Sequence, residues 1–369
     1  MAKTHDPQNE RLKRAYLTFM REAKQHSEAS LDAITKAIHR FESHTGFRSF
    51  KAFHPEQAAA FKRHLAKQTN QRTDKPLSVA TQHASLAALR GFFHWLAGQP
   101  GFRRRLSYSD ADYFNMSRGD TRIAHTQQEG RVPSLEQVML ALSGMPEATA
   151  IERRDKAVVA FTLLTGTRDG ALVSLKLKHV DLATELVSFD AREVRTKFSK
   201  SFPTWFFPVG SDSRQIVARW IAYLVELEHW GPDDPLFPCT RMELGPDRRY
   251  HAAGLKRAHW QTATPIRAIF RAAFERVGLP YFSPHSLRKT LAVLGQRKCQ
   301  NPEQFKAWSQ NLGHESPMTT LTSYGAVPAA RQAEIIRSLA VEPASGAEKL
   351  AQLRAMFDTL TPADLPKVL

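Results

Sequence analysis

Apolar side chains recur every three or four residues in three segments of the first hundred residues. Their positions are Leu31, Ile34, Ile38 and Phe41 in the first segment, Phe53, Phe61 and Leu65 in the second, and Leu86, Leu89, Phe93 and Leu96 in the third. On a helix of 3.6 residues per turn, this spacing places them on one face. The pattern therefore predicts three amphipathic helices whose apolar faces form a core.

The periodic pattern stops between Gly101 and Arg131. This stretch carries three successive arginines and then a polar run, which is typical of a connection between domains. A capping-box sequence from Ser134 to Gln137 precedes new apolar positions, so a helix should begin there. We predict a helical N-terminal domain over residues 1–118, a linker over 119–133, a second domain over 134–340 and a tail helix over 341–369.

The second domain should combine helices with a small amount of β-structure. The apolar run Ala157–Phe161 predicts a buried helix, which Gly166 can end because glycine tolerates positive φ. Two β-prone segments, Leu186–Phe189 and Trp205–Phe207, lie on either side of Lys197. The tail helix is predicted from an amphipathic spacing of apolar residues: Leu350, Leu353, Met356, Phe357 and Leu360.

Positive charge dominates the composition. The 369 residues include 52 Lys and Arg against 36 Asp and Glu, which gives a formal net charge of +16 and a pI near 10.0. Such one-sided charge indicates a polyanionic partner, for which double-stranded DNA is the natural candidate. Charge alone leaves RNA or an anionic membrane surface open.

Several kinds of chemistry lack a sequence signal. Cys239 and Cys299 form no C-x-x-C pair, and the 15 histidines show no H-E-x-x-H or similar spacing, so we expect no metal site. A Walker-type phosphate loop is absent, and we expect no cofactor. The polar N-terminus, Met1 to Glu10, has no signal-peptide pattern behind it, which favours a cytoplasmic location.

Six residues between positions 168 and 324 could together cleave a phosphodiester: Arg168, Lys197, His285, Arg288, His314 and Tyr324. Arginine offers a planar fork of donors to phosphate oxygens, histidine and lysine can transfer protons, and a tyrosine hydroxyl can attack phosphorus. Ser283 and Pro284 predict a helix start, and the spacing of His285 and Arg288 puts both on one helix face. These residue types predict cutting and rejoining of DNA through a covalent intermediate.

Each of these residues has an ordinary structural explanation when it is taken alone. Cations are common at helix C-termini, a short H-x-x-R match has a high false-positive rate, and most tyrosines near helices belong to a core or an interface. The functional interpretation therefore depends on the conjunction of several sequence blocks.

Three such blocks resemble those of the tyrosine recombinases, also called phage integrases. They are Thr165–Arg168 followed by Leu172 and Leu175, Pro284–Thr290, and Leu312–His314 leading through Thr319 and Thr320 to Tyr324. The blocks occur in the order of that family and at compatible intervals. The resemblance covers roughly residues 130 to 340.

The resemblance implies a role for each residue. Arg168 and Arg288 would bind the non-bridging oxygens of the scissile phosphate. His285 and His314 would flank that phosphate, donating hydrogen bonds and moving protons. Tyr324 would be the nucleophile, forming a 3′-phosphotyrosyl bond and releasing a 5′-hydroxyl.

Two further assignments stay open within the resemblance. Lys197 corresponds to a β-hairpin lysine that protonates the leaving oxygen, but Lys200 on the same hairpin could reach the same place. Many family members have an acidic residue three places after the first arginine. Ala171 stands there in this chain, with Asp169 nearby as a candidate substitute.

The resemblance also implies a fold and a set of partners. The expected fold is mainly α with a small antiparallel β-sheet. A helical core-binding domain (residues 1–118) and a mixed α+β catalytic domain (134–340) would form a C-shaped clamp on DNA. Four protomers would exchange strands between two DNA sites in the nucleoid, with DNA-bending proteins as possible accessories, and the tail would dock on a neighbouring protomer. Integration of a mobile genetic element is the commonest role in the family.

Two other functions fit the same residues. A type IB topoisomerase-like enzyme would apply this chemistry to one duplex as a monomer, and a non-catalytic DNA-binding protein could retain the fold. A basic segment, residues 241–260, is interleaved with Tyr250 and Trp260. It is either a DNA-contacting surface or an exposed loop anchored by buried aromatic residues.

Overall fold

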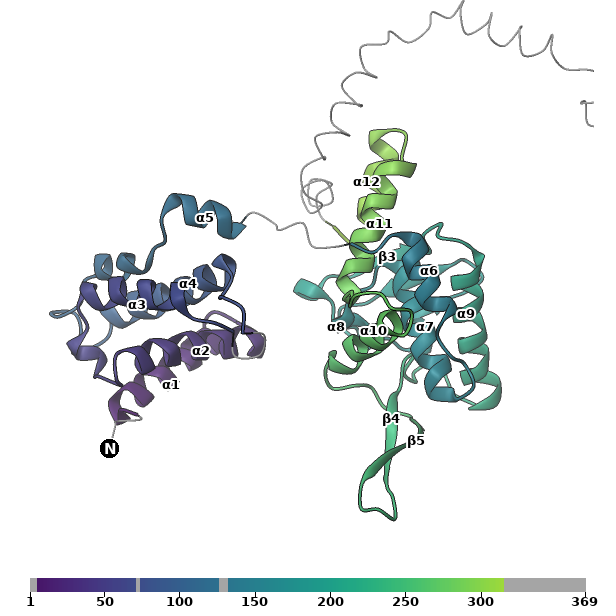
Figure 1. The fold of residues 1–369 in the computed structure, drawn as a ribbon, viewed down its shortest axis with the longest axis horizontal. Coiled ribbons are helices and arrows are strands. Elements are labelled where there is room, and N and C mark those ends of the chain that lie inside the picture. The colour runs from purple at the N-terminus through teal and green to yellow at the C-terminus, as the bar shows by residue number, and fades with distance from the viewer. Residues whose placement is uncertain (1–4, 71–73, 126–131, 315–369) are drawn as a thin grey trace, which may run out of the picture. The chain divides into compact units, whose positions relative to one another are not determined.

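The computed structural model describes residues 5–70, 74–125 and 132–314. The chain divides into two compact units, residues 1–128 and 129–369, which we call unit 1 and unit 2 (Figure 1). Helices predominate and the strands pair antiparallel, so the predicted fold class is confirmed. Tyr324 and the predicted tail helix lie outside the described residues.

Unit 1 is a bundle of helices around an aromatic core. Its elements are α1 (Pro7–Glu22), α2 (Glu28–His44), a 3-10 helix (Phe50–Ala52), α3 (Pro55–Lys67), α4 (Val79–Ala97), a second 3-10 helix (Tyr108–Phe114) and α5 (Arg118–His125). The ring centroid of Phe41 in α2 lies 5.3 Å from those of Phe61 in α3 and Phe93 in α4. The three helices predicted from apolar spacing therefore meet at Phe41.

Part of the stretch that the sequence suggested as a connection belongs to the core of unit 1. Phe102, Leu106, Ala111 and Phe114 are all buried there. The predicted linker itself begins within α5, which contacts α4. The four buried residues are spaced irregularly among arginines and acids, so the sequence shows no α-helical period.

Unit 2 packs helices around a long buried helix and a small sheet. Its elements are α6 (Leu135–Ser143), α7 (Ala150–Thr165), α8 (Asp169–Leu172), a 3-10 helix (Leu177–His179), β1 (Val180–Asp181), β2 (Leu186–Phe189), a 3-10 turn (Lys197–Ser199), β3 (Phe202–Trp205), α9 (Ser211–Ala222) with a π-helical turn after it (Tyr223–Leu227), β4 (Cys239–Leu244), β5 (Tyr250–Lys256), α10 (Thr264–Arg276), α11 (Pro284–Lys298) and α12 (Pro302–Asn311). Ser134 and Gln137 form the predicted capping box before α6.

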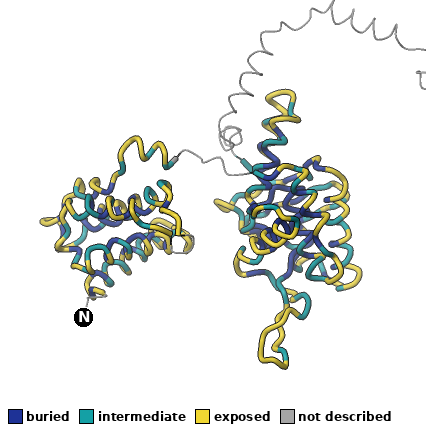
Figure 2. Tube along the Cα trace, in the orientation of Figure 1, coloured by how far each residue is buried: buried dark blue, intermediate teal, exposed yellow. Residues whose placement is uncertain are grey.

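Helix α7 is the centre of unit 2. Every residue from Ala157 to Thr165 is buried, and Figure 2 shows buried positions gathered inside this unit. Helices α6, α9, α10 and α11 all contact α7. Because helices pack against α7 on several sides, its C-terminal end has a fixed position, and so does the turn that follows Thr165.

The three-stranded sheet has the order β1-β2-β3, so β3 is an edge strand. Phe189 of β2 pairs with Phe202 of β3, and their rings stack with centroids 4.8 Å apart. The second β-prone segment was predicted too far along the chain, because β3 ends at Trp205. Phe207 instead enters the core, and its N–H donates to the carbonyl oxygen of Leu164 at 2.7 Å.

A second sheet consists of β4 and β5 alone, and this hairpin projects from the body of unit 2 (Figure 1). It contains most of the basic segment 241–260. Trp260 is buried as an anchor, but Tyr250 is 70% exposed. None of the described helices has the length and hydropathy that crossing a bilayer requires.

Candidate active site

Arg168 emerges from the core directly after α7. The helix ends at Gly166, whose φ of 63° is the left-handed conformation predicted for it, and Arg168 is the N-cap of α8. A Cβ at Gly166 would lie 2.8 Å from Leu312 Cδ2, so this turn needs glycine for space as well as for φ. The buried α7 therefore fixes the point from which Arg168 extends.

Arg288 is buried in α11, with only 3% of its surface exposed. Its Nη1 donates to the carbonyl oxygen of Gly166 at 2.7 Å, and its Nη2 donates to the carbonyl oxygen of Leu312. One guanidinium thus joins the turn before Arg168 to the turn before His314.

A small pocket brings three of the predicted residues together. Arg168, Lys197 and Arg288 all line it. Four threonine side chains contribute to the same wall: Thr165, Thr167, Thr196 and Thr204. Three cations and several hydroxyl groups surround this pocket of about 20 Å³, and their charge and donors suit an oxygen atom of an anion such as a phosphodiester.

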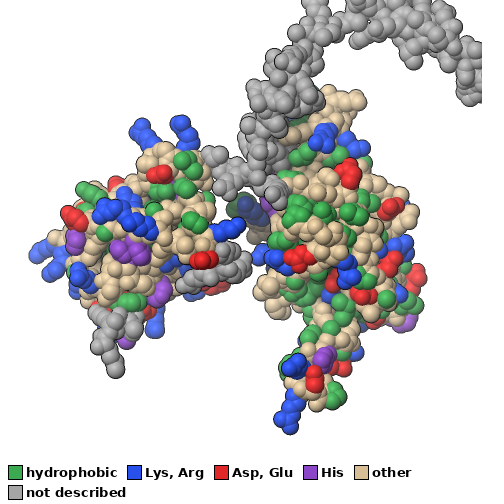
Figure 3. Space-filling model, in the orientation of Figure 1, with side chains coloured by type: hydrophobic (Ala, Val, Ile, Leu, Met, Phe, Trp, Pro, Cys, Tyr) green, Lys and Arg blue, Asp and Glu red, His purple; other side chains and the backbone are tan. Residues whose placement is uncertain are grey.

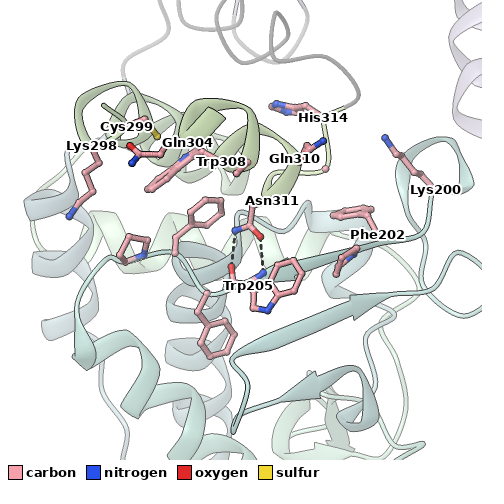
Figure 4. A pocket seen from close by; sticks show the side chains of 16 residues that line it. Lys200, Phe202, Trp205, Lys298, Cys299, Gln304, Trp308, Gln310, Asn311 and His314 are labelled. Carbon is pink, nitrogen blue, oxygen red and sulfur yellow. Dashed lines mark hydrogen bonds between the residues drawn. The ribbon is translucent and has the colours of Figure 1, made fainter. Parts of the chain in front are cut away.

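His314 lies beside this pocket, on a tight turn after α12. Gly313 has a φ of 66°, and a Cβ there would meet the Phe202 ring at 2.6 Å. Phe202 lines both the small pocket and a neighbouring groove of about 990 Å³ between β3 and α12. Figure 4 shows His314 and Lys200 at one end of that groove, and Lys298 and Cys299 at the other.

Asn311 fastens the turn that carries His314 to the edge of the sheet. Its side-chain oxygen accepts from the N–H of Trp205 at 2.8 Å, and its Nδ2 donates to the Trp205 carbonyl oxygen at 2.9 Å (Figure 4). The hydroxyl of Thr204 donates to the Asn311 carbonyl oxygen. The amide therefore satisfies the open edge of β3 much as another strand would. No sequence pattern indicated this role, because an asparagine at a helix end is common.

The two predicted histidines lie in a strongly positive environment. Burial is the main cause that lowers the pKa of His314 to about 4, and four positive groups lower it further: Arg288, Arg168, His285 and Lys200. Partial removal from water lowers the pKa of His285 as well, and the charge of Arg288 adds to that effect. His314 is therefore neutral at pH 7, and a bound phosphate would raise both pKa values by offsetting the repulsion.

The two candidate lysines approach the site differently. Lys197 lines the small pocket with the arginines, and its Nζ lies 4.8 Å from the ring centroid of Phe198. Lys200 lines the groove with His314. Between them, Phe198 and Ser199 have φ angles of 63° and 49°, a strained backbone for residues other than glycine. Both lysines remain candidates for the leaving-group acid.

Asp169 and Ala171 both lie in α8, shortly after Arg168. Ala171 lines the small pocket. Asp169 accepts from Arg267 of α10 at 2.7 Å, and its negative charge offsets a small part of the lowering of the His285 pKa. The charge of Asp169 therefore acts on His285. Its assignment as the substitute acid stays a prediction.

Comparisons with known proteins concern the family and the fold of the chain. The family model described as Phage integrase family matches residues 135–331, more than half of the chain. A tyrosine recombinase XerC from Azotobacter vinelandii is 26% identical over 307 residues, which cover 83% of this chain and 88% of that protein.

Two groups of solved structures share the fold. A lambda integrase dimer bound to a COC′ core site has a TM-score of 0.58 at 12% identity and covers 85% of this chain and 94% of its own. A Tn1549 transposon integrase in complex with a circular intermediate DNA has a TM-score of 0.56 at 14% identity, covering 89% of this chain and 99% of its own. At these identities the likeness shows the fold alone.

Proposed function

This chain belongs to the phage integrase family, and on that premise we propose that it is a site-specific DNA recombinase acting through a covalent 3′-phosphotyrosyl intermediate. The observation that carries the proposal is the pocket shared by Arg168, Lys197 and Arg288. The charges of both arginines also act on His314, so the pocket and the histidine turn form one electrostatic unit. Unit 1 would bind the core site, and unit 2 would perform the chemistry.

Stabilisation of the phosphate is the first part of the mechanism. Attack on phosphorus builds charge on the non-bridging oxygens, where Arg168 and Arg288 would donate hydrogen bonds. Preorganised donors of this kind contribute about 3 kcal/mol each to lowering a barrier. A guanidinium has five N–H groups, and two of those of Arg288 donate to the carbonyl oxygens that orient it.

Proton movement is the second part. The Tyr324 hydroxyl loses its proton as its oxygen bonds to phosphorus, and a neutral His314 can accept that proton. The bond from phosphorus to the 5′-oxygen breaks, and Lys197 or Lys200 supplies a proton to that oxygen. Rejoining reverses these steps, so the energy of the phosphodiester is kept and no nucleotide is hydrolysed.

Exchange between two duplexes requires four strands to be cut and rejoined. Because each chain would supply one Tyr324, four protomers on two DNA sites fit this need. Accessory DNA-bending proteins, a cytoplasmic location at the nucleoid and integration of a mobile element remain parts of the proposal.

Covalent capture tests the proposed reaction. Wild-type protein incubated with duplexes from its native genomic neighbourhood, including nicked suicide substrates, should give a denaturant-resistant adduct mapped to Tyr324. Tyr324→Phe should bind the same DNA and give none, because phenylalanine has no nucleophilic oxygen. Tyr281→Phe is the matched control. The ring of Tyr281 packs against Arg271, and this variant should form as much adduct as the wild type.

The other functions give different products in the same assay. Tight binding by the wild type with no adduct on any substrate would indicate a DNA-binding protein without catalysis. An adduct accompanied by relaxation of supercoils, and never by joining of two sites, would indicate a topoisomerase.

A substrate with sulfur at the leaving 5′ position separates Lys197 from Lys200. A thiolate leaves without protonation because its conjugate acid has a pKa far below that of an alcohol. We expect Lys197→Ala to form adduct on ordinary DNA about 10²-fold or more slowly than the wild type. On the sulfur substrate, adduct formation by this variant should return to the wild-type rate. Lys200→Ala should show little change on either substrate.

Lys298→Ala is a suitable control for the lysine test, because Lys298 lines the far end of the groove. Rescue of Lys200→Ala in place of Lys197→Ala would reverse the assignment. Failure of the sulfur substrate to rescue either variant would exclude both lysines as the acid.

A further inference from the structure

The β4–β5 hairpin has one apolar face that nothing in the described chain covers. Its register places Met242 opposite Ala252 and Leu244 opposite Tyr250, and paired residues point to the same side of a sheet. Met242 is 51% exposed, Leu244 61% and Tyr250 70%. The large apolar side chains of this ribbon therefore gather on one face and remain in water.

The turn of the hairpin carries positive charge that is not neutralised within it. Asp247 is engaged by His251, whose Nε2 lies 2.8 Å from Asp247 Oδ1, and Glu243 pairs with Arg241 at 3.1 Å. Arg248 and Arg249 form no ion pair with any residue that the structure describes. Figure 3 shows Lys and Arg side chains at the protruding end of this hairpin.

A partner would explain why this ribbon persists. A two-stranded hairpin is marginally stable by itself in water, and this one pairs with no other strand. Four cations against two acids over residues 239–256 favour a polyanion as the partner.

The base of the hairpin adjoins the candidate active site. Nη1 of Arg195, two residues before Lys197, donates to the carbonyl oxygen of Gln261 at 3.0 Å. From there β5 runs for seven residues, or roughly 20 Å at about 3.3 Å per residue. Since duplex DNA rises about 3.4 Å per base pair, the length of β5 corresponds to about six base pairs.

We propose that the outer half of this hairpin binds duplex DNA beside the cleavage site. Arg248 and Arg249 contact backbone phosphates, and the face of Met242, Leu244 and Tyr250 lies against the sugars of the groove wall. The inference rests on the proposed function, since it adds a contact to a DNA complex that Arg168 and Arg288 would anchor. Phosphate contacts of this kind set affinity and register and carry no base sequence information.

Salt-dependent binding of the full chain to a fluorescein-labelled, mixed-sequence duplex tests the arginines. Each phosphate contact contributes about 0.9 to the slope of log affinity against log salt concentration. The double variant Arg248→Ala/Arg249→Ala should lose about tenfold or more in affinity at low salt, and its slope should fall by about 1.8. Arg214→Ala/Arg219→Ala is the matched control. It removes two positive charges from exposed arginines of α9, each of which forms an ion pair with a glutamate elsewhere in unit 2, and it should leave the slope unchanged.

The apolar face needs a second variant, Leu244→Ser/Tyr250→Ser. We expect a several-fold loss of affinity at an unchanged slope, because these side chains bury area without displacing counterions. Analytical ultracentrifugation of the wild type and this variant without DNA tests whether a second copy of the chain covers the apolar face instead. A change in self-association with DNA affinity unaltered would assign this face to a second copy of the chain and overturn its DNA contact.

The outcomes separate this inference from the proposed function. If the wild type binds duplex DNA and the Arg248/Arg249 double variant matches it in affinity and slope, the hairpin contact is overturned and the recombinase proposal stands. If the wild type itself binds no duplex at any salt concentration, both proposals fail together.

Discussion

Replacing Arg288 with lysine should remove almost all covalent adduct formation and leave a folded, less stable protein. Lysine keeps the positive charge but carries its donors on one nitrogen, so it cannot reproduce a planar fork. Arg288 holds the carbonyl oxygens of Gly166 and Leu312 at once, and these belong to the turns before Arg168 and His314. Loss of the fork therefore displaces both turns as well as one phosphate contact.

The expected magnitudes follow from those two functions of the guanidinium. Loss of one preorganised oxyanion donor reduces a rate about 10²- to 10³-fold. Leaving one buried carbonyl without its donor costs about 1–3 kcal/mol in the free energy of unfolding. Single-turnover adduct formation on a suicide substrate measures the first effect, and urea denaturation measures the second.

Arg297→Lys is the matched control for Arg288→Lys, because Arg297 is an exposed arginine of the same helix. Adduct formation should be compared at a temperature where all three proteins are folded. Near wild-type adduct formation by Arg288→Lys under that condition would contradict its phosphate-binding role, even if its stability fell.

Much of the helical framework could be predicted because local periodicity determines it. The spacing of Leu31, Ile34 and Ile38 defined the core face of α2, and all three are buried. The left-handed Gly166 and the capping box at Ser134 were equally visible, since each depends on neighbours within a few residues. The interactions that stabilise these features are between residues close together in the sequence.

The features that were missed depend on distant partners. Phe207 looked like a strand residue, yet its N–H bonds to Leu164 and its ring fills the core. Phe102 and Phe114 looked like parts of a connection because their burial depends on contacts with Phe93 and the rest of the unit 1 core. Neither case carries a periodic signal.

The chemistry of the candidate site was easier to predict than its geometry. The order of the sequence blocks made Arg168 and Arg288 candidates, but it did not indicate the bonds that tie Arg288 to carbonyl oxygens 122 and 24 residues away. The choice between Lys197 and Lys200 depends on two left-handed residues between them, and neither is a glycine that would have revealed the turn. Tyr324 lies beyond the described residues, so its role stays a prediction.

Gly166→Ala should strongly damage both the stability of the protein and its activity. A left-handed residue with a Cβ costs about 1–2 kcal/mol, and forcing a methyl into a packed core costs about 1–3 kcal/mol more. The new Cβ would lie 2.8 Å from Leu312 Cδ2 and 3.1 Å from Leu291 Cδ1. The carbonyl oxygen of Gly166 is also the acceptor for Arg288. We expect a loss of about 2–5 kcal/mol in unfolding free energy, with adduct formation reduced further than the folded fraction explains.

Gly278→Ala separates backbone strain from crowding in this prediction. Gly278 has a similar φ of 72°, but an added Cβ meets nothing within 4 Å. The control should therefore lose only the strain of about 1–2 kcal/mol and keep its adduct formation. If Gly166→Ala and Gly278→Ala lost the same stability and both retained activity, the contact between this turn and Leu312 would not matter. The two arginines would then be positioned by something other than the junction of α7, α11 and α12.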